Sequence, residues 1–193
     1  MRSGATIRNS GEKPFQSRRR GSAIVEFTLA ATFMFVPIMA GLGTVGISVI
    51  RGMEVAGVNS SAGQMFSSGV DFTNATNVNI LIQVAGNLGL SASGGNGVVI
   101  LSELEGTSAG AVCTQQIIIG NAGLRSSSYV NPTDVNSSGD VTNLNDPSAQ
   151  VGSNLPITLS AGQTVYLAET YFNNSLYAFS SAGGTGIYMM NIF

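Results

Sequence analysis

The sequence predicts an α+β protein, in which a long N-terminal transmembrane helix precedes a small extracytoplasmic domain with one further helix and an antiparallel sheet. Residues 27–50 contain no charged side chain. At about 1.5 Å per residue, a helix of that length crosses the roughly 30 Å hydrocarbon core of a bilayer. The later sequence carries one stretch with helical spacing of apolar residues, followed by runs with strand-like composition. A helix followed by sequential strands is typical of an α+β domain.

The distribution of charge supports this division of the chain. Only 9% of the residues are charged, and six of the eight Lys and Arg lie within the first twenty residues. After Gly21, two arginines stand against nine acids. A segment this acidic has no basic surface that could bind the phosphates of nucleic acid, so we expect no nucleic-acid binding. We expect a basic cytoplasmic leader at 1–21, a transmembrane helix at 22–50, a helical stalk at 51–75 and a domain at 76–193, with a flexible loop at about 125–153.

The orientation of the helix follows from its flanking charges. Arg18, Arg19 and Arg20 precede the apolar run, and only Arg51 follows it. Because positive charge stays on the cytoplasmic side, the N-terminus is expected in the cytoplasm and the rest of the chain across the membrane. The apolar run is too long for an ordinary cleaved signal peptide, and no small-x-small cleavage site follows it. We therefore expect a single-pass protein whose span stays attached.

One acidic residue stands near the start of this apolar helix. Glu26 follows Ser22-Ala23-Ile24-Val25 and precedes Phe27. A charged carboxylate costs about 2.5–3.5 kcal/mol at the centre of a membrane span, and less near its ends. Two interpretations stay open: the side chain reaches the headgroup level, or it meets a cationic partner inside the membrane.

The run from Arg18 to Phe27 resembles the N-terminal signature of type IV pilins and pseudopilins. Its triple arginine and its Glu-Phe pair are similar to those of TadE-like minor components of the tight-adherence (Tad/Flp) branch. The resemblance implies that a prepilin peptidase cuts between Gly21 and Ser22, which makes Glu26 the fifth mature residue. It further implies that this carboxylate meets the free amino terminus of a neighbouring subunit.

The same resemblance implies the location and the partners of the protein. We expect a minor subunit or assembly factor of a Tad/Flp-type pilus, held in the bacterial inner membrane with its C-terminal domain in the periplasm or on the pilus. The expected partners are the lipid bilayer, the prepilin peptidase, other pilin-like subunits and the Tad assembly machinery. The alternative is an uncleaved, signal-anchored periplasmic binding or envelope protein. A third, less favoured hypothesis is a membrane-tethered hydrolase that uses Glu103, Glu105 or Glu169.

Within the span, Pro37 removes one backbone donor and predicts a bend. Gly41, Gly43 and Gly46 follow, and small residues of this kind let another helix approach closely. We interpret these three glycines as a packing face, although glycine is also simply tolerated in membrane helices.

The expected elements of the exported domain come from periodicity and composition. Apolar residues recur at helical spacing between Thr76 and Leu90. Strands are predicted at 98–104, 112–119 and 164–172, with weaker candidates at 155–159 and 187–193. The late Val165-x-x-x-Glu169-x-Tyr171 pattern is similar to a strand of TadE-like proteins.

Several motifs match catalytic or ligand-binding patterns but lack the context that those patterns need. Residues 41–46 fit G-x-G-x-x-G inside the apolar helix rather than between a strand and a helix. Residues 106–110 fit G-x-S-x-G, but the chain has no histidine to activate the serine. Residues 134–145 resemble a calcium loop, but they lack the glutamate at its twelfth position. Cys113 is interpreted as a small core residue. We therefore expect no enzyme activity, catalytic residue, cofactor or metal site.

Overall fold

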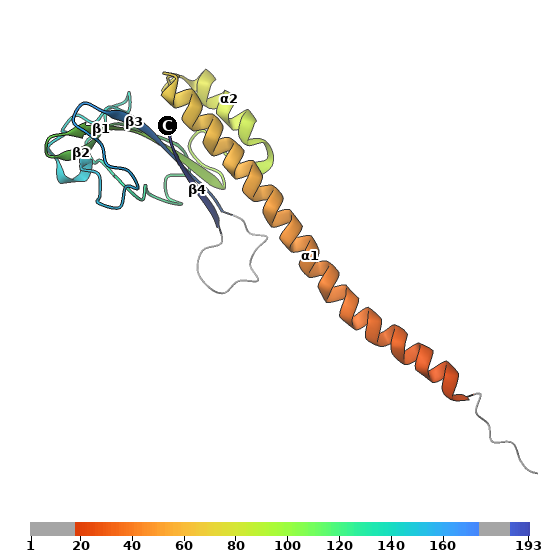
Figure 1. Ribbon diagram of the computed structural model, residues 1–193. Coiled ribbons are helices and arrows are strands. Elements are labelled where there is room, and N and C mark those ends of the chain that lie inside the picture. Colours follow the sequence, from red (N-terminus) through yellow and green to blue (C-terminus); the bar gives the residue numbers. More distant parts are fainter. Residues whose placement is uncertain (1–17, 174–185) are drawn as a thin grey trace, which may run out of the picture. The chain divides into compact units, whose positions relative to one another are not determined.

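The computed structural model describes residues 18–173 and 186–193, and the chain divides into two compact units, Met1–Ser48 and Val49–Phe193 (Figure 1). In chain order the elements are helix α1 (Arg18–Ser67), helix α2 (Ala75–Ala85) and strands β1 (Gly97–Thr107), β2 (Gly110–Gly120), β3 (Thr164–Asn173) and β4 (Gly186–Ile192). Short 3₁₀ turns lie at Gly86–Leu88 and Pro147–Ala149. These elements confirm the predicted α+β layout.

Helix α1 is 50 residues long and continues through Pro37 without interruption. Within the described residues, one helical stretch, Ser22–Ser67, is long and apolar enough to cross a membrane, and its most apolar part is not buried. This finding is compatible with a single-pass membrane protein.

In the second unit, the predicted helix between residues 76 and 90 is confirmed as α2 and the 3₁₀ turn that follows it. The side chain of Asn74 caps α2 by accepting a hydrogen bond of 2.9 Å from the backbone N–H of Thr76. The apolar face of α2 buries Leu81 and Ala85. Gly89 follows the 3₁₀ turn with a φ of 78°, a left-handed conformation that favours glycine and ends the helical segment.

The sheet has four antiparallel strands in the order β2-β1-β3-β4. Strands β1 and β2 form a hairpin, with a register shift opposite Glu103 and Leu104. The predictions at 98–104, 112–119, 164–172 and 187–193 are confirmed as strands. The weak prediction at 155–159 is wrong, because this stretch lies in a loop. Pro156 lacks the N–H group that a ladder would need at its position.

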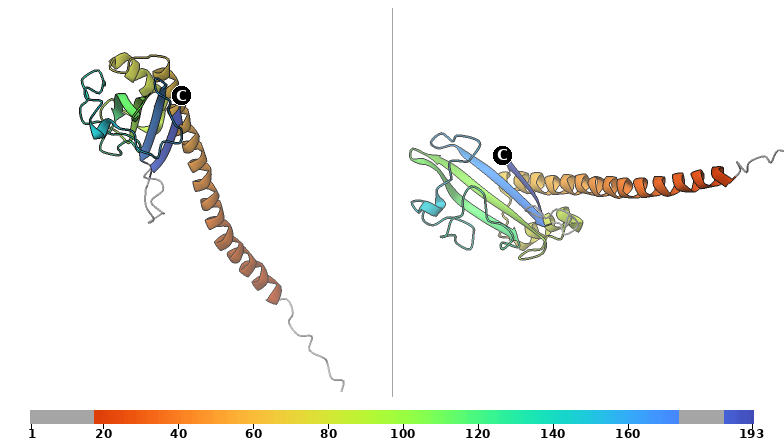
Figure 2. Two further views of the ribbon diagram at one scale, coloured as in Figure 1. Left: turned by 60° about the vertical axis from the view of Figure 1, so that its left-hand side comes forward. Right: turned by 90° about the horizontal axis from the view of Figure 1, so that it is seen from below.

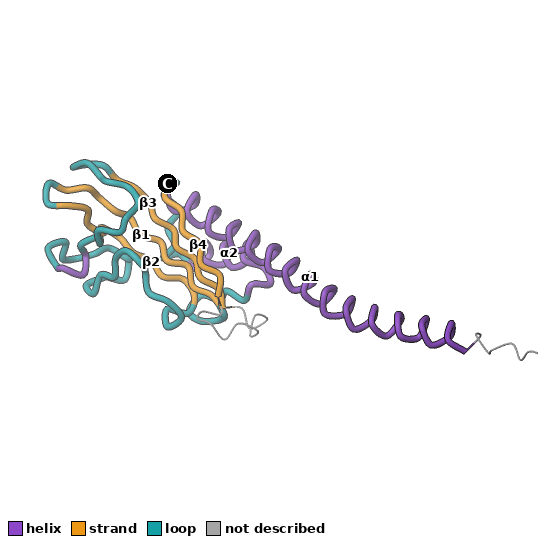
Figure 3. The backbone as a smooth tube through the Cα atoms, turned by 60° about the horizontal axis from the view of Figure 1, so that its bottom comes forward, coloured by secondary structure: helices purple, strands orange, loops and turns teal. Residues whose placement is uncertain are grey.

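Side chains alternate across the sheet and form two cores, one on each face. On the helix-side face, α2 and the α1 residues from Val55 onward pack against the sheet, and the ribbons of these elements are seen in Figure 2. The loop-side face is covered by irregular chain, drawn in teal in Figure 3. The buried members of the helix-side core are Val55, Val58, Ala62, Phe66, Phe72, Leu81, Ala85, Leu90, Val99, Leu101, Ile119, Ala168 and Phe172. Those of the loop-side core are Leu104, Cys113, Val130, Val141, Ala149, Val165 and Leu167.

The long connection between β2 and β3 forms this second cover. It buries Val130, Val141 and Ala149 against the sheet. Its backbone also pairs with the outer edge of β2: the N–H of Val141 donates to Thr114 (2.8 Å) and that of Val151 donates to Ala111 (2.9 Å). An edge strand that is paired in this way is protected from pairing with other chains. The flexibility predicted for 125–153 stays a prediction.

A buried polar residue joins α1 to the sheet. Asn59 is fully buried, and its side-chain amide lies 2.9 Å from the hydroxyl of Thr170 on β3. With the amide nitrogen turned toward β3, it also donates to the carbonyl of Ala168 (2.9 Å). Because a buried amide without partners is costly, these bonds fix the position of this part of α1 on the strand.

Candidate functional site

The first candidate site is the apolar surface of α1 that precedes the folded unit. Large side chains along it are open to their surroundings; Phe27 is 74% exposed and Phe33 is 79% exposed. Soluble proteins seldom expose so large an apolar surface, so lipid or partner helices would cover it. Three threonine hydroxyls in this stretch return hydrogen bonds of 2.8 Å to carbonyls of the preceding turn, at Thr28, Thr32 and Thr44. Their polar atoms therefore need no water.

Glu26 is the one acidic residue on this surface. Its Oε1 accepts a hydrogen bond of 2.8 Å from the hydroxyl of Ser22, one helical turn earlier. Among the side chains that the structure describes, the only ion pair joins Arg51 and Glu54 at 2.9 Å, so Glu26 has no cationic partner within that set. A partner for this carboxylate would have to come from residues outside that set or from another molecule.

The other predicted site residues of this region lie on the same helix. Gly21 and Ser22 fall in the first turns of α1, which begins at Arg18, so the helix runs across the predicted cleavage position. At Gly41, Gly43 and Gly46, no atom beyond the chain neighbours and the backbone of the adjoining helical turns lies within 4 Å of the position that a Cβ would occupy. The space beside these glycines is open to a second helix, and their roles stay predictions.

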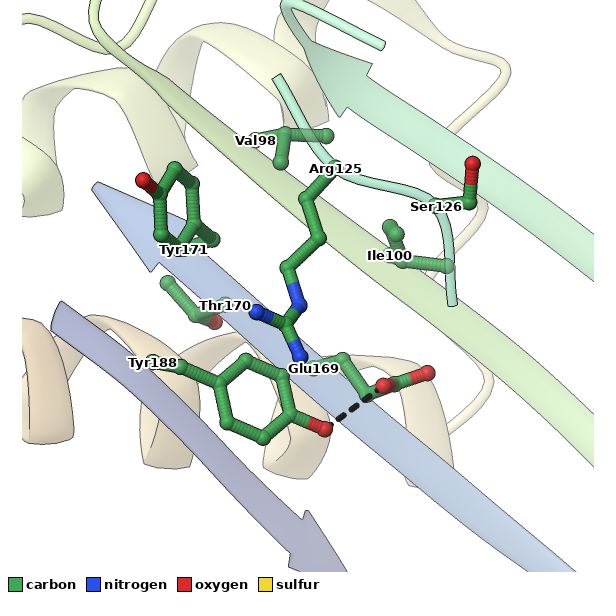
Figure 4. Close-up of a pocket in the computed structure, with 8 residues that line it drawn as sticks. All are labelled: Val98, Ile100, Arg125, Ser126, Glu169, Thr170, Tyr171 and Tyr188. Atoms are coloured by element: carbon green, nitrogen blue, oxygen red, sulfur yellow. Dashed lines mark hydrogen bonds between the residues drawn. The ribbon is translucent and has the colours of Figure 1, made fainter. Parts of the chain in front are cut away.

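The second candidate site is a buried polar cluster on the loop-side face, which sequence analysis did not predict as a unit (Figure 4). Glu169 on β3 is only 2% exposed. Its carboxylate accepts hydrogen bonds from the hydroxyl of Ser127, from the backbone N–H of Ser128 (2.9 Å) and from the hydroxyl of Tyr188 on β4 (2.6 Å). Burial and the hydrogen bond to Glu169 raise the pKa of Tyr188, so its hydroxyl keeps its proton and acts as a donor.

Arg125 completes this Glu169 cluster. Its guanidinium carbon lies 4.0 Å from the ring centroid of Tyr188 and 5.7 Å from that of Tyr171, which are cation–π distances. One terminal nitrogen donates to the hydroxyl of Ser128 (3.1 Å), while the buried Nε has no hydrogen-bond partner. The side chains fill the space between them and leave no room for a ligand. The cluster therefore links the β2–β3 connection to two strands.

The sheet also separates two of the three carboxylates that the hydrolase hypothesis invoked, Glu103 and Glu169. Glu169 pairs with Ile100 across β1 and β3, and it lies on the loop-side face. Glu103 stands three residues further along β1 than Ile100, so it points to the helix-side face. The fold does not bring Glu103 and Glu169 together.

The remaining motifs form turns and core. Residues 106–110 make the turn between β1 and β2, where the hydroxyl of Thr107 donates to the carbonyl of Gly110 (2.7 Å). In the stretch that resembles a calcium loop, the carboxylate of Asp140 accepts hydrogen bonds from the side-chain amides of Asn136 and of Gln115 on β2. Over residues 18–173 and 186–193, no three His, Cys, Asp or Glu side chains group as metal ligands. Cys113 is confirmed as a buried core residue, and burial raises the pKa of its thiol to about 12.

Comparison with models of protein families, with characterised proteins and with solved structures gives no match to this chain.

Proposed function

We propose that this protein is a pilin-like subunit of the TadE-like kind, a non-enzymatic minor component or assembly factor of a Tad/Flp-type pilus. The observation that carries the proposal is an exposed apolar helical surface with a single carboxylate, Glu26, which is the fifth residue after the predicted cleavage position. In this proposal a prepilin peptidase removes residues 1–21, and α1 anchors the product in the inner membrane.

The energetics of the helix give Glu26 its role. An unpaired carboxylate within a span costs a few kcal/mol, whereas a matched pair of opposite charges removes much of this penalty. The new α-amino group at Ser22 of a neighbouring subunit carries a positive charge at the same end of the apolar helix as Glu26. Because only one register brings the two groups together, the pair specifies how adjacent helices align.

The second unit suits a role in display and contact rather than in chemistry. The part of α1 that contributes Val55, Val58 and Ala62 is itself part of the domain core. In a subunit of this kind, the helix that packs among its neighbours is thus continuous with the folded domain. The β2–β3 connection, fastened by the Glu169 cluster, is the longest irregular segment of the described residues, and such segments often contact partners.

Processing by a prepilin peptidase tests the proposal. The full chain is co-expressed with an active prepilin peptidase, and its intact mass is measured after purification from membranes. The expected product begins at Ser22, and Gly21→Ala is expected to leave the chain at full length. Gly4→Ala, a glycine change within the leader but away from the junction, serves as the matched control and should still be processed. If the wild-type chain stays at full length beside an active peptidase, the signal-anchored alternative replaces the proposal.

A further inference from the structure

A cavity of about 190 Å³ lies on the helix-side face of the sheet, beside the end of α1. Phe66, Val70 and Asp71 contribute one wall from the end of α1 and the turn that follows it. Glu103 on β1, Ile117 on β2 and Tyr166 on β3 contribute the other wall. All six residues belong to the second compact unit.

Two carboxylates and the end of a helix make the electrostatic potential of this cavity negative. Asp71 and Glu103 both line it. Hydrogen bonds from the hydroxyl and the N–H of Thr73 lower the pKa of Asp71, which keeps its carboxylate charged. Burial raises the pKa of Glu103, and the negative charge of the nearby Glu105 and Asp140 carboxylates, which adds to the potential of the cavity, raises it further. The C-terminal end of α1, where the helix dipole is negative, lies at the same place.

The second unit holds no spare cation for this cavity. Residues 49–193 contain two basic side chains, Arg51 and Arg125. Arg51 is paired with Glu54, and Arg125 lies against the ring of Tyr188. A metal ion is a poor fit, because the described part of the chain has no group of three residues that could hold one. A cationic side chain that binds in this cavity therefore comes from outside the second unit.

The walls of the cavity select an organic cation. The rings of Phe66 and Tyr166 meet edge to face, with their centroids 5.5 Å apart, and Val70 and Ile117 add aliphatic surface. Apolar walls accept the methylene stem of lysine or arginine, while a carboxylate and an aromatic face bind its charged end. We propose that this cavity binds the side chain of a lysine or arginine that projects from a partner protein. This inference does not depend on processing or on pilus assembly.

Titration of the ¹⁵N-labelled full chain in detergent micelles with N-acetyl-lysine methylamide tests the inference. The expected result is saturable shifts of the Val70, Gln115 and Tyr166 amides within about 50 mM ligand, which is the range for one weakly held side chain. N-acetyl-norleucine methylamide has nearly the same stem without the charge and should give no saturable shift. Glu103→Gln should weaken lysine binding at least about fivefold. Asp146→Asn, an acid remote from the cavity, should leave lysine binding unchanged.

Four results would overturn the inference. Equal shifts with the lysine and norleucine compounds would show that binding does not depend on the positive charge of the ligand. Lysine binding that is unchanged in Glu103→Gln would show the same for the negative charge of Glu103. Saturable shifts with calcium chloride at lower concentrations than with the lysine compound would assign the cavity to a metal. Shifts at these amides that grow with protein concentration and disappear in Arg51→Gln would identify a second copy of this chain as the occupant.

Discussion

Replacement of Glu169 tests whether the polar cluster fastens the β2–β3 connection to the sheet. Glu169→Gln keeps the shape of the side chain but removes the charge that three donors share. Hydrogen bonds to a charged group contribute about 1.5–3 kcal/mol each and neutral ones about 0.5–1.5 kcal/mol. Because the amide keeps part of this bonding, we expect a loss of about 2 kcal/mol in the free energy of unfolding. Glu169→Ala leaves buried donors without an acceptor and should cost about 4 kcal/mol.

Denaturant unfolding of the full chain in detergent, followed by near-ultraviolet circular dichroism, measures the global effect. Hydrogen exchange at the amide of Ser128, which donates to Glu169, measures the local effect. If the Ser128 amide exchanges through an opening that breaks its bond to Glu169, a loss of about 2 kcal/mol makes its exchange about 30-fold faster. Glu105→Gln, a carboxylate change at the far end of β1, is the matched control. If both Glu169 variants unfold like this control and the Ser128 amide keeps its protection, the assigned role of the cluster is wrong.

Three further predictions concern two buried residues and one half-buried residue of the second unit. Asn59→Ala should lower the free energy of unfolding by about 2–3 kcal/mol, because it leaves polar groups of the sheet without a partner. Thermal unfolding measures this loss, and an unchanged midpoint would contradict the role assigned to Asn59. The pKa of Glu103 is raised above its ordinary value of 4.5, so its ionisation on going from acid to neutral pH opposes folding. Glu103→Gln should therefore raise the unfolding midpoint at pH 7 and leave it unchanged at pH 3, and an equal change at both pH values would contradict this reasoning. The thiol of Cys113 is buried and its pKa is raised to about 12, so iodoacetamide at pH 8 should label it only after unfolding. Mass spectrometry measures the labelling, and rapid labelling of the folded chain would contradict the buried position of Cys113.

The sequence predicted the elements well wherever periodicity and composition agree. No charged residue interrupts the apolar run at 27–50, and the whole run lies within helix α1. The strands at 98–104 and 164–172 are rich in β-branched and aromatic residues, and both appear in the sheet. The stretch at 155–159 has a similar share of apolar residues, but Pro156 has no N–H group to donate to a neighbouring strand. Composition alone did not reveal this difference.

The candidate site was predictable only in its local part. Glu26 and Ser22 lie one helical turn apart, so their proximity follows from the sequence. Ser127 and Glu169 are 42 residues apart, and they meet only because the β2–β3 connection folds back over β3. Two signals were present nonetheless. Arg125 is the one cation in residues 52–193, and Glu169 is the one charge within its apolar strand. The two lone charges predict that these segments meet, but they do not reveal that both side chains contact Tyr188 rather than form an ion pair with each other.

The role of Glu26 in subunit alignment is open to one direct measurement. In cells that assemble a Tad/Flp-type pilus with this subunit, the amount of the processed chain in sheared filaments and in membrane complexes is compared between wild type and Glu26→Leu. Glu54→Gln, a carboxylate change further along the same helix, is the control. We expect Glu26→Leu to be processed and inserted in the membrane but lost from both assemblies, while the control behaves as wild type. Equal incorporation of Glu26→Leu and wild type would show that no charge match at the membrane helix aligns this protein with its neighbours.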